Sequence, residues 1–71
     1  MTADGFALFD TAIGRCGIAW RGGAVVGVQL PEAREAATRT RLRTRFPGAP
    51  EVPPGAVVRR AVDAIVALLD G

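Results

Sequence analysis

Short apolar runs separated by glycines fill the first part of the chain, and this pattern is typical of β-strands. Alternation over residues 6–11 predicts a first strand with both faces partly covered, and a second apolar run follows at residues 16–20. The Arg-Gly-Gly sequence at residues 21–23 is the clearest hairpin signal in the chain. A third strand is expected over residues 24–30, where valines suit a half-buried surface and Gly27 indicates a close approach or a bulge. The pattern therefore predicts an antiparallel meander of three strands.

Residues 32–45 contain neither glycine nor proline and are predicted to form a helix. Pro31 suits the first helical position, and the Phe-Pro-Gly sequence at residues 46–48 is a stop signal. Glu35 precedes Arg39 by four residues, which is the favourable order for an ion pair on a helix. A strand gains nothing from that spacing.

Every second residue near the end of this segment is an arginine, namely Arg39, Arg41, Arg43 and Arg45. In a strand these residues share one basic face, whereas in a helix they form two groups that flank a stripe of Thr38, Leu42 and Phe46. Like charges four residues apart cost an isolated helix about 0.2–0.5 kcal/mol per pair. Burial of a leucine or phenylalanine side chain contributes about 1.5–3 kcal/mol. Because this burial outweighs the repulsion between the arginines, the segment is predicted to be a helix.

A proline-rich loop at residues 47–55 precedes the strongest helical pattern in the chain. Its apolar stripe and the residues that widen the stripe are Val58, Val62, Ile65 and Leu69, with Ala61, Val66 and Leu68 beside them. Arg59 and Asp63 pair outside this stripe, and Gly71 suits a C-cap. We therefore expect one small α+β domain over residues 1–71, a three-stranded antiparallel meander followed by two helices.

The composition limits how such a domain is held together. The chain has 71 residues, one cysteine and no histidine, which excludes an intramolecular disulfide and a zinc site built from cysteine and histidine. A chain of this length buries only roughly 60% of its unfolded surface, so we expect marginal stability and an apolar face that another component covers. A single thiol suits the cytoplasm, and the sequence indicates no targeting or membrane-spanning segment. We expect a cytoplasmic protein.

Cys16 is the only nucleophile of note. A reactive thiolate needs a neighbouring base, cation or helix N-terminus, and the sequence offers only Arg15 beside it. A small buried strand residue is the favoured interpretation, and a thiol enzyme is the competing one. Spacing does not bring Asp10, Asp63 and Asp70 together, and the glycine-rich stretches match no phosphate-binding pattern. We predict no catalytic, cofactor-binding or metal-binding residue in this chain.

The candidate contact residues for nucleic acid or an acidic partner are Arg39, Arg41, Arg43 and Arg45. Guanidinium groups bind phosphates with an affinity that falls as salt rises. The net charge is only +2 and no aromatic residue is interleaved to stack bases, so a solvated helix end is the favoured interpretation. An autonomous arginine-rich binding module is the alternative function.

Four stretches follow one another along the chain: FALFDTAIGRCGIAW (6–20), GGAVVGVQLPEA (22–33), RLRTRFPGA (41–49) and AVDAIVALLDG (61–71). In order and spacing they resemble the N-terminal domain of the methylated-DNA-protein-cysteine S-methyltransferase family, the alkylguanine-DNA alkyltransferases. The resemblance covers residues 5–71. It implies a ribonuclease-H-like α/β domain that packs against a catalytic domain.

The resemblance also implies a role in the repair of DNA damage. Members of this family flip an alkylated guanine out of DNA and transfer its 6-O alkyl group to a cysteine in a PCHR motif of the second domain. Cys16 stands in RCGI instead, so no catalytic residue transfers to this chain, and the zinc ligands of some relatives are absent too. The chain would be the non-catalytic half of a methyltransferase, inactive alone. Its partner would be the catalytic C-terminal domain, with DNA bound through that domain and self-association through the exposed apolar face.

Overall fold

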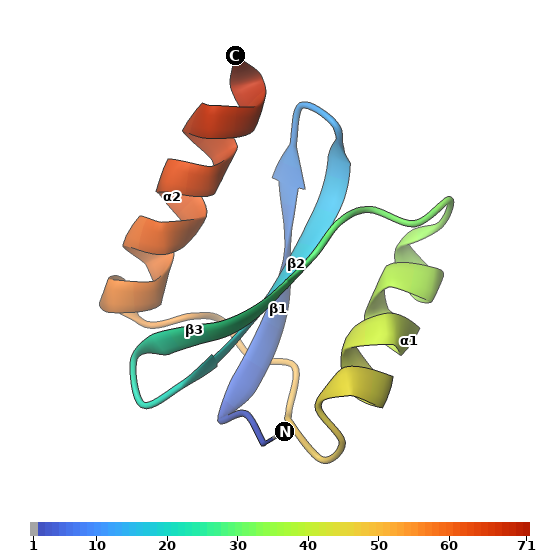
Figure 1. The fold of residues 1–71 in the computed structure, drawn as a ribbon, viewed down its shortest axis with the longest axis vertical. Helices are drawn as coiled ribbons and strands as arrows, with labels where there is room; N and C mark the ends of the chain where they lie inside the picture. Colours follow the sequence, from blue (N-terminus) through green and yellow to red (C-terminus); the bar gives the residue numbers. More distant parts are fainter. Residues whose placement is uncertain (1) are drawn as a thin grey trace.

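A computed structural model, which describes residues 2–71, contains a three-stranded antiparallel sheet followed by two helices (Figure 1). The elements are β1 (Gly5–Thr11), β2 (Gly14–Arg21), β3 (Ala24–Gln29), α1 (Glu35–Arg45) and α2 (Ala56–Asp70). The predicted α+β class and the order of strands and helices are thus confirmed. Neither helix is long and apolar enough to cross a membrane.

The sheet has the order β1-β2-β3, so β2 is central and both other strands are edges. The predicted hairpin between β2 and β3 is confirmed, with positive φ at Gly22 (56°) and Gly23 (85°). Two positive φ angles in a two-residue loop are the geometry of a type I′ turn, which matches the twist of the strands that it joins. The glycine signal in the sequence was therefore specific enough to place this turn.

Gly27 shows both features that its position in a strand predicts. Ala19 pairs with Gly27 while Trp20 pairs with Val25, so β3 carries one extra residue beside Gly27. A Cβ atom on Gly27 would lie 2.5 Å from the Phe46 ring. The absence of a side chain on β3 therefore allows the end of α1 to approach the sheet closely.

The two helices cover opposite faces of the sheet (Figure 1). Successive strand residues point to opposite faces, and the buried side chains divide accordingly into two clusters. The cluster under α1 contains Phe6, Ala19, Leu42 and Phe46, and the cluster under α2 contains Ile18, Trp20, Val58 and Val62. The expectation that the first strand is covered on both faces is confirmed.

Helix α1 begins at Glu35, so the predicted start at residue 32 is wrong by one turn. The buried hydroxyl of Thr38 accepts a hydrogen bond from the Glu32 backbone N–H at 3.0 Å and lies 3.4 Å from the Arg34 carbonyl oxygen. Arg34 is extended and caps the helix (φ −132°). Because Thr38 holds Glu32 outside the helix, the chain enters α1 later than the absence of glycine and proline suggests. The predicted end is confirmed.

Helix α2 buries its predicted stripe only in part. Val58 and Val62 are buried, and Ala61, Ile65 and Val66 pack beside them. Leu68, which widens the predicted apolar stripe, is 80% exposed, so this part of the stripe is not covered by the sheet. The side chains packed under α2 come from β1 and β2. Arg59 and Asp63 lie on the flank of α2 that faces β1. Leu68 lies on the opposite flank of the helix.

The proline-rich loop contributes a short segment to the sheet. The Phe6 N–H donates to the Pro50 carbonyl at 3.0 Å, and the Val52 N–H donates to the Phe6 carbonyl at 3.0 Å. Glu51 thereby forms a parallel bridge with Phe6 on the outer edge of β1. The loop predicted at residues 47–55 is confirmed, and one part of it behaves as a strand.

Candidate functional site

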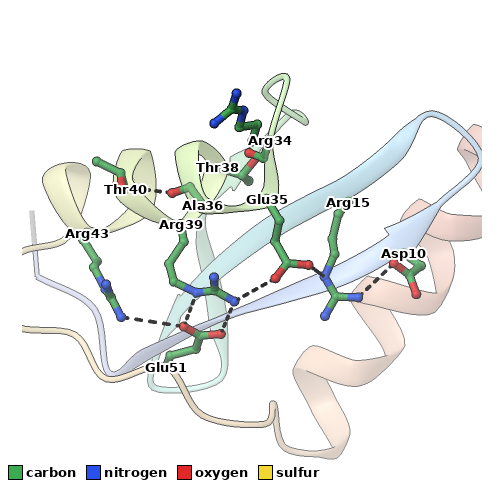
Figure 2. A network of polar contacts seen from close by, with 10 residues as sticks. All are labelled: Asp10, Arg15, Arg34, Glu35, Ala36, Thr38, Arg39, Thr40, Arg43 and Glu51. Carbon is green, nitrogen blue, oxygen red and sulfur yellow. Dashed lines mark hydrogen bonds and ion pairs between the residues drawn. The ribbon is translucent and has the colours of Figure 1, made fainter.

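The arginines of α1 separate onto two flanks of the helix, as helical spacing predicts. Arg39 binds the Glu51 carboxylate with both Nε (2.6 Å) and Nη2 (3.1 Å), and Arg43 lies 3.9 Å from the same carboxylate (Figure 2). The i,i+4 pair between Arg39 and Glu35 forms at 3.3 Å. Arg39 and Arg43, two of the four candidate contact residues, thus share one carboxylate partner within the domain.

This flank belongs to a continuous chain of ion pairs (Figure 2). The Glu35 Oε1 atom lies 2.7 Å from Arg15 Nε. The contact is an ion pair but does not have the geometry of a hydrogen bond. Arg15 in turn donates from Nη1 to Asp10 at 2.9 Å. With Arg39, Arg43 and Glu51, the network contains three guanidinium groups and three carboxylates. It therefore carries no net charge and connects β1, β2, α1 and the proline-rich loop.

On the other flank, Arg41 binds Glu32 at 2.8 Å. Arg45 donates to the Val28 carbonyl at 3.0 Å, and its guanidinium lies 5.1 Å from the centre of the Phe46 ring. Arg45 therefore covers part of the outer edge of β3. The four predicted contact arginines do not form one basic face, and each has an acidic or carbonyl partner in the domain.

The hydrogen bond from Arg39 lowers the pKa of Glu51 below its ordinary value, and the same bond raises the pKa of Arg39. Because the folded-state pKa of Glu51 is depressed, its contribution to stability is present at neutral pH and is lost as the pH falls through that pKa. We expect Glu51→Gln to lower the unfolding free energy at pH 7 by a small amount and to flatten its fall towards pH 3. Urea denaturation at several pH values measures this.

Arg39→Gln provides the matched control for this prediction, because it removes the partner and leaves the carboxylate in place. Arg39→Gln should also reduce the fall of the unfolding free energy towards pH 3. A Glu51→Gln profile parallel to that of the unchanged protein would show that the Arg39–Glu51 pair contributes nothing to stability. Both side chains are partly exposed, so screening by solvent keeps the effect well below that of a core substitution.

Cys16 is fully buried on the α2 side of the sheet, which confirms its interpretation as a core strand residue. Its Sγ lies 3.6 Å from the Thr11 hydroxyl. The neighbouring Arg15 points to the other face, where it contacts Glu35. The one cation that the sequence places beside the thiol is thus directed away from it.

A hollow of about 340 Å³ lies between β1 and α2. Asp10 and Asp63 both line it, although their spacing along the chain does not bring them together. Asp10 is paired with Arg15, and Asp63 lies 4.0 Å from Arg59. Within residues 2–71, no group of three or more acidic, cysteine or histidine side chains is arranged to hold a metal ion. Only the packing of α2 across β1 creates this hollow, so no local sequence signal predicts it.

Large apolar side chains remain exposed on the α2 side of the molecule. Val25 and Val28 pair with Trp20 and Ile18 in the sheet and so lie on this face, yet they are 41% and 40% exposed. We call this region the β3–α2 apolar surface, and its residues are Val25, Val28, Leu30, Val57 and Leu68. Exposed large apolar side chains on one side of a domain are candidates for contact with a partner.

Comparisons with models of protein families, with curated proteins and with solved structures found no match. A functional proposal for this chain therefore rests on its sequence motifs and on the geometry of its sheet and helices. The β3–α2 apolar surface and the hollow beside β1 are the two features that suit binding.

Proposed function

We propose that this chain is the non-catalytic N-terminal domain of a DNA-repair alkyltransferase of the methylated-DNA-protein-cysteine S-methyltransferase family. The observation that carries this proposal is where the resembling motifs fall in the fold. FDTAIG forms the turn between β1 and β2, VQLPE leaves β3, LRTRFPG ends α1 and ALLDG ends α2. Motifs that mark the ends of elements support a shared architecture, because turns and caps need particular residues.

The topology supports the ribonuclease-H-like part of the proposal. Three antiparallel strands are followed by a helix, then by the bridge of Glu51 parallel to β1, and then by a second helix on the other face. The bridge adds a short parallel segment to the sheet, at the edge of β1 that faces away from β2. The resemblance implies a small antiparallel sheet with helices, and the three-stranded sheet with its two helices is compatible with that expectation.

In this proposal the domain contributes a docking surface and no chemistry. The catalytic domain would supply the cysteine that accepts the 6-O alkyl group and would contact DNA, in the cytoplasm. The β3–α2 apolar surface would pack against that domain, since burial of each large apolar side chain contributes about 1.5–3 kcal/mol. In the absence of the partner, the same surface would promote self-association.

The test is transfer of a labelled methyl group from methylated DNA, with this chain alone and with a separately supplied catalytic domain of the family. We expect label only on the added domain, and more of it when this chain is present. Leu68→Asp should abolish the increase, whereas Ala67→Asp, at an exposed position outside the β3–α2 apolar surface, should retain it. Label on Cys16 or no effect of the chain on the catalytic domain would overturn the proposal.

The alternative function, an arginine-rich module for nucleic acid or an acidic partner, would use Arg39, Arg41, Arg43 and Arg45. Their observed partners weaken it, because binding would first have to separate Arg39 from Glu51 and Arg45 from the β3 edge. Arg41 and Arg43 are both more exposed than Arg39. Steeply salt-dependent DNA binding by this chain alone, lost in Arg41→Gln/Arg43→Gln, would favour this function over the first.

A further inference from the structure

The two edges of the sheet differ in how they are covered. On β3, the guanidinium of Arg45 donates a hydrogen bond to the outward-facing carbonyl oxygen of Val28. On β1, the Pro50–Val52 segment pairs only with Phe6, near the start of the strand (Figure 1). Unpaired edge groups attract further strands, and β1 is the edge with which a segment of this chain already pairs as a strand.

Leu8 and Asp10 present the open backbone groups of this edge. In an antiparallel pair, the groups that point away from the partner strand recur at every second residue. Phe6 uses its outward N–H and C=O for the loop segment, so the next outward groups are those of Leu8 and Asp10. Pro53 and Pro54 cannot extend the pairing because they have no N–H to donate. Among residues 2–71, no strand pairs with this half of the edge.

The hollow between β1 and α2 lies directly beside these open groups. Its lining is mixed, and Phe9, Val62 and Val66 belong to the apolar part. The charged residues that line it occur as pairs of opposite sign: Asp10 with Arg15, and Arg59 with Asp63. A lining without net charge does not select an anion such as DNA, and a hollow of about 340 Å³ has room for an aliphatic side chain against its apolar residues.

We propose that the open half of the β1 edge binds an extended peptide segment of a partner protein as an added strand. The segment continues the line of strand pairing that Pro50–Val52 begins, with backbone hydrogen bonds to Leu8 and Asp10. One aliphatic side chain of the segment enters the hollow against Val62 and Val66. Backbone pairing provides affinity and the pocket provides selectivity, as in other cases of strand addition. This site is separate from the β3–α2 apolar surface and does not depend on the alkyltransferase proposal.

The probe is a capped hexapeptide of alternating threonine and valine, titrated into ¹⁵N-labelled protein and followed by amide chemical shifts. We expect the Leu8 and Asp10 amides to shift most and to gain protection from hydrogen exchange, with the β3 amides unchanged. The control is the same peptide with every backbone nitrogen methylated, which has no N–H to donate and should not bind. Equal shifts with the methylated peptide, or no shift at Leu8 and Asp10, would overturn the proposal.

Two variants test the backbone contact in the protein itself. Asp10→Pro removes the outward N–H, whereas Asp10→Ala removes the same carboxylate and ion pair but keeps that N–H. Loss of one hydrogen bond should weaken binding by about five- to tenfold in Asp10→Pro relative to Asp10→Ala. Equal affinity of the two folded variants would contradict strand addition. If the same amides shift with protein concentration alone, a second copy of this chain occupies the edge, and the peptide proposal is wrong.

Discussion

Phe46→Ala is expected to lower the unfolding free energy by about 3–5 kcal/mol. The Phe46 side chain is 2% exposed and packs with Phe6, Ala19 and Leu42 under α1, where the missing side chain of Gly27 leaves space for its ring. Deletion of the ring removes its burial and leaves a cavity between α1 and the sheet. Since small domains are stable by only about 5–15 kcal/mol, this loss removes a large fraction of the domain's stability.

Urea denaturation followed by far-ultraviolet circular dichroism measures this loss, and the fluorescence of Trp20 reports on the opposite face. Leu68→Ala is the matched control, because Leu68 is 80% exposed and its truncation should change the unfolding free energy by less than about 0.5 kcal/mol. Similar losses in the two variants would mean that Phe46 is not a core residue.

Gly17→Ala is expected to destabilise the domain by about 1–3 kcal/mol, although alanine usually stabilises a strand relative to glycine. A Cβ atom on Gly17 would collide with the Leu42 side chain, which is fully buried between α1 and β2. The new methyl group therefore forces Leu42 out of position or moves the helix away from the sheet. The measurement is the unfolding free energy of the single variant.

A double-mutant cycle with Leu42→Ala identifies this collision as the cause. Leu42→Ala alone should cost about 2–5 kcal/mol through the cavity that it leaves. In Gly17→Ala/Leu42→Ala the added methyl group meets no leucine, so the combined cost should be clearly smaller than the sum of the two single costs. Additive costs would show that Gly17 is needed for a reason other than the approach of α1.

The sequence alone was sufficient for the elements whose signals are local. The hairpin at Gly22 and Gly23 depends on two adjacent residues that accept positive φ, and the stripe of Thr38 to Phe46 depends on spacing within one helix. The choice of helix over strand for the arginine-rich segment was likewise correct, because the burial of Leu42 outweighs local repulsion between like charges. These features need no knowledge of what lies across the fold.

Tertiary structure decided everything that depends on contacts between distant segments. The start of α1 depends on the Thr38 hydroxyl and the Glu32 backbone, and the arginine partners include Glu51 and the Val28 carbonyl from other segments. The exposure of Leu68 and the hollow beside β1 follow from where α2 crosses the sheet. Periodicity shows which side of a helix is apolar, but only packing determines how much of that side another element covers.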